Sequence, residues 1–104
     1  MTTVNYLYDK PLGYAKSGAV DAATLVSSLT FDGQGAPGIP LSTKTLLIVP
    51  EVQAVRWKDN GTAPTAALGQ PLAVGSELRY TGNPANIQFI SQTAGALINV
   101  TAFG

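Results

Sequence analysis

The fold is indicated most clearly by residues 55–61, which read Val55-Arg56-Trp57-Lys58-Asp59-Asn60-Gly61. Val55 and Trp57 alternate with two basic residues, which is the pattern of a strand with one buried face. Trp57 is therefore predicted to be a structural anchor in the core or between two sheets, with its basic neighbours facing solvent. Asp59, Asn60 and Gly61 tolerate positive φ, so these three residues are predicted to form a turn that reverses the chain.

The C-terminal side of the chain repeats this pattern of short strands and turns. Leu78 and Tyr80 alternate with charged residues, Ile87 and Phe89 flank a glutamine, and an apolar segment spans residues 96–101. The sequence has 7 prolines and 11 glycines, which leave no long uninterrupted helical segment. We therefore predict an all-β fold, a single-domain antiparallel β-sandwich or a small jelly-roll-like β-barrel.

The N-terminal side is less regular. Residues 46–49, Leu-Leu-Ile-Val, predict a continuous apolar strand that ends at Pro50, and residues 32–40 are rich enough in Gly and Pro to predict a surface loop. Residues 22–30 fit a short helix by the spacing of their leucines. Their Thr, Val and Ser content favours instead a strand that ends at Phe31.

Residues 1–20 are expected to form either an N-terminal arm that docks on a neighbouring chain or an edge strand, and residues 21–104 to form the β-sandwich domain. The first segment holds three of the 4 tyrosines, Tyr6, Tyr8 and Tyr14. Tyrosine provides a large contact area with few rotatable bonds to immobilise, so these three residues are candidate interface residues.

The charge content restricts the possible partners. Charged residues make up 12% of the chain and the net charge is zero, whereas about 25% is usual. Few charges leave a surface prone to association, so we expect a homo-oligomer (a dimer or trimer) or an assembly component. The basic residues do not cluster, so no nucleic-acid partner is expected. No apolar run reaches the ~20 residues of a membrane span, so no membrane partner is expected. The first residues lack signal-peptide features, which predicts synthesis in the cytoplasm.

No residue pattern points to catalysis. The sequence contains no histidine and no cysteine, which excludes Ser-His and Cys-His nucleophiles and metal sites built on those side chains. The 6 acidic residues are too dispersed for a calcium loop, and their spacing singles out no catalytic pair. We therefore predict no catalytic, cofactor-binding or metal-binding residues. A carboxylate hydrolase is the one enzymatic alternative.

The second half of the chain resembles a group of small structural proteins of tailed bacteriophages. The resemblance is carried by residues 55–65 (Val-Arg-Trp-Lys-Asp-Asn-Gly-Thr-Ala-Pro-Thr), residues 69–82 (Gly-Gln-Pro-Leu-Ala-Val-Gly-Ser-Glu-Leu-Arg-Tyr-Thr-Gly) and residues 97–100 (Leu-Ile-Asn-Val). The group has a V-R-W-R-D-[DN]-G-T-x-P-T stretch, then G-x-x-L-x-x-G-x-x-L-x-Y-x-G and a closing L-N-V strand. Lys58 stands where the group has its second Arg, and Ile98 where it has Leu.

The resemblance implies a virion location after synthesis in a bacterial host. The leading hypothesis is a capsid decoration or cement protein that binds the assembled shell, with the major capsid protein or another virion protein as its partner. The alternative is a head-fibre, neck or tail-tip component that binds a host surface or a carbohydrate. In that case the polar loops at residues 32–40 and 62–71 would form the recognition surface.

Overall fold

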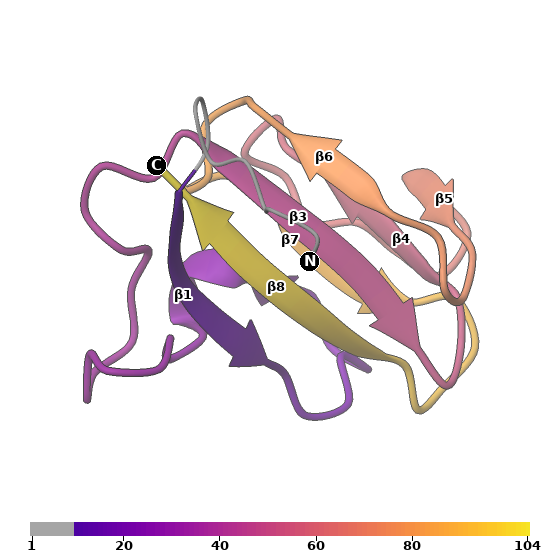
Figure 1. The fold of residues 1–104 in the computed structure, drawn as a ribbon. Helices are drawn as coiled ribbons and strands as arrows, with labels where there is room; N and C mark the ends of the chain where they lie inside the picture. The colour runs from indigo at the N-terminus through magenta and orange to yellow at the C-terminus, as the bar shows by residue number, and fades with distance from the viewer. Residues whose placement is uncertain (1–9) are drawn as a thin grey trace.

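The computed structural model describes residues 10–104, and these residues form strands connected by loops and turns (Figure 1). The predicted all-β class is confirmed, since the one helical element of the described residues is a three-residue 3-10 helix. The elements are β1 (Pro11–Lys16), β2 (Thr24–Leu25), η1 (Val26–Ser28), β3 (Thr45–Glu51), β4 (Val55–Lys58), β5 (Gln70–Leu72), β6 (Leu78–Tyr80), β7 (Gln88–Ser91) and β8 (Leu97–Phe103).

The strands form two antiparallel sheets of four strands each. The first sheet has the order β1-β8-β3-β6 and the second the order β2-β7-β4-β5. In Figure 1, β1, β8 and β3 lie side by side in front of the second sheet. Within residues 10–104 no strand belongs to both sheets, so the sheets do not close into a barrel and the barrel alternative is wrong.

The strand pairs follow one rule: the first strand pairs with the last, and each next strand inward pairs likewise. β1 pairs with β8, β2 with β7, β3 with β6, and β4 with β5. This is the pairing of one long hairpin that folds back between β4 and β5. It also brings the two ends of the described chain together, because Lys10 and Gly104 exchange backbone hydrogen bonds of 2.9 and 2.8 Å.

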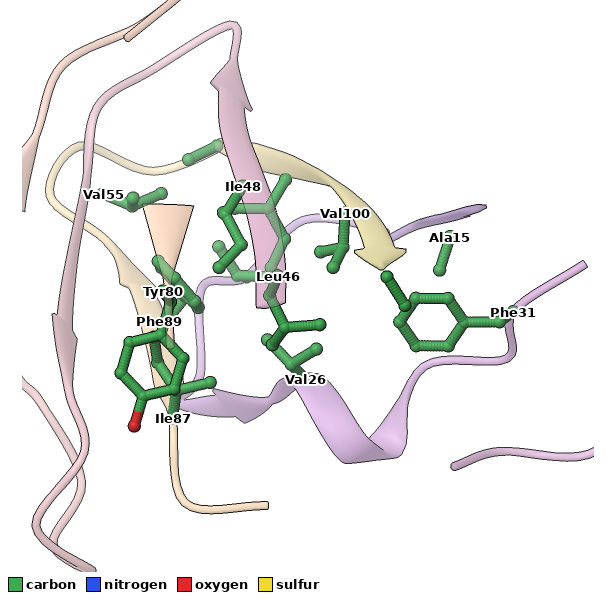
Figure 2. Close-up of a cluster of buried hydrophobic side chains, with 14 residues drawn as sticks. Ala15, Val26, Phe31, Leu46, Ile48, Val55, Tyr80, Ile87, Phe89 and Val100 are labelled. Carbon is green, nitrogen blue, oxygen red and sulfur yellow. The ribbon is translucent and has the colours of Figure 1, made fainter. Parts of the chain in front are cut away.

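A single buried cluster draws its side chains from both sheets and from the connections between them. Figure 2 shows Phe31 and Ala15 at one end of this cluster and Tyr80 and Phe89 at the other. Phe31 comes from the connection between η1 and β3, and its side chain is fully buried. Phe31 therefore anchors this connection in the core, while residues 32–37, within the predicted surface loop, are exposed.

Residues 10–20 belong to the same folded unit as the rest of the described chain. β1 is an edge strand of the first sheet, and Ala15 and Val20 lie in the buried cluster. Val20 also exchanges backbone hydrogen bonds with the β7–β8 region, to Ala96 at 2.9 Å and from Ser91 at 2.7 Å. Residues 1–9 lie outside the described part of the chain.

The prediction of a strand that ends at Phe31 is wrong, because the observed strand is shorter and ends at Leu25. Only Thr24–Leu25 pairs with a neighbouring strand, and η1 follows directly. The Ser28 hydroxyl donates a hydrogen bond to the Leu25 carbonyl at 2.6 Å. Such local side-chain bonds offer the backbone an alternative to a sheet ladder, so the serine that favoured a strand contributes to its early end.

The prediction that Pro50 ends its strand is also wrong, since β3 runs on to Glu51. Pro50 lies opposite Ile98 of β8. Its carbonyl oxygen accepts a hydrogen bond from the Gly75 amide at 3.0 Å, in the β5–β6 connection. The nitrogen and the carbonyl of one strand residue point to the same side, so the missing N–H of Pro50 faces away from β8 and leaves that ladder intact.

Candidate functional site

The first candidate site is the outward side of the first sheet, where apolar side chains face away from the buried cluster. Inward and outward residues alternate along β3 and β8, and Leu46, Ile48 and Val100 are among the inward ones. We define the outward face by six side chains on the opposite side: Leu12, Tyr14, Leu47, Val49, Leu97 and Phe103. Antiparallel sheets usually present polar residues to solvent on their second face. In this sheet the second face carries these six apolar side chains as well as the polar Asn99 and Thr101 of β8.

Polar groups lie beside and between the apolar side chains of the outward face. Lys16 forms an ion pair of 3.2 Å with Glu51, and the side-chain amide of Asn99 donates a hydrogen bond to the same carboxylate. The Asn99 hydrogen bond and the Lys16 charge hold the pKa of Glu51 below its ordinary value. The Arg79 guanidinium lies 5.7 Å from the centre of the Phe103 ring. Protein–protein interfaces likewise combine apolar contacts with hydrogen-bonding groups.

Tyr14 is the one predicted interface tyrosine that the structure describes, and its side chain is 55% exposed on the outward face. Its backbone is not free to pair with another chain. The Tyr14 amide donates to the Asp32 carboxylate at 2.7 Å, and the Asp32 amide donates to the Tyr14 carbonyl at 2.9 Å. This loop occupies the β1 edge at Tyr14, so another strand could not pair with that residue. Tyr6 and Tyr8 lie outside the described residues.

The second candidate site is a cleft where β4 and β5 open into their connecting loop. The Trp57 cleft, as we call it, has a volume of about 490 Å³ and is lined by Trp57, Lys58, Asp59, Asn60, Leu68, Gly69 and Gln70. Trp57 is partly buried and packs against the core cluster. Its ring makes an edge-to-face contact with Tyr80 of the other sheet, with 6.0 Å between ring centres.

The predicted turn residues contribute to this cleft. The chain does reverse between β4 and β5, but over the whole of residues 59–69. Asn60 Oδ1 accepts hydrogen bonds from the Thr62 amide at 3.2 Å and the Thr62 hydroxyl at 2.6 Å, and Gly61 has φ of 85°. Asp59 instead accepts a hydrogen bond of 2.9 Å from the Tyr80 hydroxyl. That contact joins residues distant in sequence, so no local pattern indicates it.

Arg56 has a role that the sequence analysis missed. Strand alternation assigned it to solvent, whereas its Nε donates to the Ala66 carbonyl at 3.1 Å and its Nη1 to the Gly69 carbonyl at 2.9 Å. The guanidinium therefore fixes the 59–69 loop over β4. Its acceptors are backbone carbonyls, which every residue type provides, so the sequence carries no signal for this contact.

Burial and the neighbouring Asp59 carboxylate raise the pKa of Tyr80 to about 12. Between pH 10 and this value the unfolded chain loses the tyrosine proton and the folded chain keeps it. We therefore expect the free energy of unfolding to fall as the pH rises above about 10. Denaturant unfolding at about pH 8 and about pH 11 measures this effect.

The Tyr80→Phe variant should lose less stability over the same pH interval, because it lacks the titrating group. Tyr14→Phe, which changes an exposed tyrosine, is the matched control and should behave like the wild type. Equal pH dependence in wild type and Tyr80→Phe would contradict the assignment of the raised pKa.

No three His, Cys, Asp or Glu side chains of residues 10–104 gather into a group that could hold a metal ion. No helix in that range has the length and apolar character needed to cross a membrane. The fold and the two surfaces thus define an all-β protein of two four-stranded antiparallel sheets. Comparisons with protein families, curated proteins and solved structures find no match to this chain.

Proposed function

We propose that this protein is a virion structural protein, a capsid decoration or cement protein that binds the assembled shell and stabilises it by protein–protein contacts. The observation that carries the proposal is the outward face, whose six apolar side chains no described residue buries fully. Exposed apolar patches rimmed by polar groups mark interaction sites in soluble proteins. The low charged fraction of 12% is consistent with a surface that is covered in use.

We further infer that the two sheets form a jelly-roll sandwich. The pairing of β1 with β8, β2 with β7, β3 with β6, and β4 with β5 is the pairing of a rolled hairpin. Jelly rolls of eight strands recur in viral capsid and lectin domains. This fold-level analogy supports a virion setting but assigns no function by itself.

The outward face would pack against the major capsid protein or another virion protein, with the protein arranged as a dimer or trimer at symmetric positions of the shell. Leu47 and Val49 lie at its centre, because β3 is an inner strand of the sheet. Tyr14 adds an aromatic contact beside them, since it shares a register row with Thr101 and Leu47. Tyr6 and Tyr8 remain predicted interface residues of the same contact.

The first test is the copy number of this chain relative to the major shell protein. Quantitative mass spectrometry would be applied to virus particles purified from cells that carry this sequence. A ratio of one, or a simple fraction set by the shell symmetry, is expected for a decoration protein. A much lower ratio would instead indicate a vertex, neck or tail component. Absence from the particles would overturn the virion proposal.

A second test addresses the outward face itself. Tyr14→Ser is expected to weaken binding to shells by about tenfold or more, because truncated aromatic anchors dominate interface energies. Its thermal stability should stay close to that of the wild type, since the side chain is largely exposed. Leu41→Gln is the matched control, because Leu41 is 92% exposed but lies outside this face. Equal shell binding by wild type and Tyr14→Ser would exclude the outward face as the contact.

A further inference from the structure

We propose that the Trp57 cleft binds a neutral pyranose sugar. The proposal goes beyond binding to a shell, and it rests on a different sheet and on different residues from the outward face. The volume of the Trp57 cleft, about 490 Å³, lies within the range of small-molecule sites. The lining combines one aromatic ring with amide, carboxylate and ammonium groups.

The Trp57 ring provides the apolar wall of the site. It is partly buried, and its edge-to-face contact with Tyr80, at an interplanar angle of 71°, holds it in one orientation. An aromatic face carries partial negative charge. The C–H groups on one side of a pyranose ring carry partial positive charge, so the flat side of a sugar complements the exposed part of the indole.

Two polar groups of the cleft, on Asp59 and Asn60, are oriented before any ligand arrives. The Tyr80 hydroxyl holds the Asp59 carboxylate at 2.9 Å, which leaves its remaining lone pairs as acceptors for sugar hydroxyls. The two hydrogen bonds from Thr62 fix the carbonyl end of the Asn60 side chain, so its NH₂ group points away from Thr62 as a donor. Neighbouring sugar hydroxyls each donate and accept, and this set of groups matches both roles.

The loop that forms the other wall is held in place. Arg56 fixes it through two backbone carbonyls, and Pro64 within it is buried. A Cβ atom at Gly69 would lie 3.0 Å from the Trp57 carbonyl oxygen, so the loop approaches β4 closely. A wall fixed in this way lowers the entropy that binding must remove.

The charge of the cleft favours a neutral ligand. Lys58 and Asp59 are its two charged lining residues and have opposite signs. A phosphate or an acidic sugar would be expected to meet several cationic groups, whereas the cleft offers one lysine beside a carboxylate. Inorganic phosphate and an acidic sugar are therefore the comparison ligands for the test.

The experiment uses the full chain and its single tryptophan. An array of neutral glycans identifies candidates, and each is titrated while the Trp57 fluorescence is recorded. Glucuronate and inorganic phosphate are titrated in parallel. We expect a saturable change in Trp57 emission with at least one neutral glycan and a weaker response to the two anions. Binding of no neutral glycan, or preference for the anions, would overturn the proposal.

A pair of glutamine variants tests the location. Gln70→Ala changes an exposed side chain of the cleft, and we expect it to weaken glycan affinity by roughly threefold to tenfold, the effect of one lost hydrogen bond. Gln92→Ala changes an exposed glutamine in the β7–β8 connection and should leave the affinity unchanged. Equal affinities of the two variants would exclude the cleft as the site. Isothermal calorimetry measures both affinities.

The sugar proposal and the shell proposal can fail separately. Gln70→Ala should bind shells like the wild type, and Tyr14→Ser should bind glycan like the wild type. If Tyr14→Ser lost glycan binding while remaining folded, the ligand would lie on the outward face and the cleft proposal would be wrong.

Discussion

Replacing Phe31 with alanine is expected to lower the free energy of unfolding by about 3–5 kcal/mol, the usual cost of emptying the place of a fully buried phenylalanine. Phe31 has no exposed surface, and its side chain lies against Gly13 of β1, where a Cβ atom would be 3.3 Å from the Phe31 Cβ. The loss would be a large part of the total free energy of unfolding, which is typically about 5–15 kcal/mol for a small domain.

Urea unfolding of the wild type and the variant measures this loss. Phe103→Ala provides the comparison, because Phe103 is the partly exposed phenylalanine of the outward face. It should cost clearly less, since part of its surface already contacts solvent. If Phe31→Ala cost no more than Phe103→Ala, the Phe31 side chain would not be part of the core in solution.

The second large effect is expected at Gly82, where any side chain meets the Tyr80 ring. A Cβ atom built on Gly82 would lie 2.6 Å from Tyr80 Cζ and closer still to the hydroxyl oxygen. Gly82→Ala therefore has to displace a ring that packs on Trp57 and donates a hydrogen bond to Asp59. We expect a destabilisation of about 1–3 kcal/mol, the usual range for overpacking a filled site.

The matched control is Gly18→Ala. No atom lies within 4 Å of a Cβ at Gly18, so this variant should stay within about 0.5 kcal/mol of the wild type. Thermal unfolding of both variants gives the comparison. A Gly82→Ala protein as stable as Gly18→Ala would mean that the Tyr80 ring has room to move, and the rigidity assumed for the Trp57 cleft would be lost with it.

The two proposed binding surfaces do not compete for the same residues. The outward face belongs to β1, β8 and β3 of the first sheet, and the Trp57 cleft is built on β4 and β5 of the second. A shell partner and a sugar could therefore bind one molecule at the same time. We expect glycan affinity to be the same for the free protein and for the protein bound to shells.

Strand positions could be predicted where one face of a strand is buried. The alternation of Leu78 and Tyr80 with charged residues places these two side chains inward, as the structure has them. Ile98 and Val100 alternate in the same way along β8. The period of two in a strand is a property of the local backbone, so the sequence alone carries it.

The residues at which a strand ends, and the strands beside which it lies, could not be predicted in the same way. Pro50 stays in β3 because its missing N–H faces away from β8, and strand order decides which side that is. The apolar run at Leu46–Val49 predicts a strand but does not distinguish its two faces, whereas the structure buries Leu46 and Ile48 and leaves Leu47 and Val49 partly exposed. The difference in burial between the two sides of β3 arises only when the second sheet packs on one of them, and the other side becomes part of the outward face.

Residue types and local periodicity were sufficient to predict the all-β class and most of the strands, and the composition includes no histidine or cysteine. The order of the strands, the burial of Phe31 and the contacts of Arg56, Asp59 and Tyr80 that shape the cleft depend on how the whole chain folds. Those contacts join residues far apart in the chain, and their energies depend on distances that no local pattern encodes.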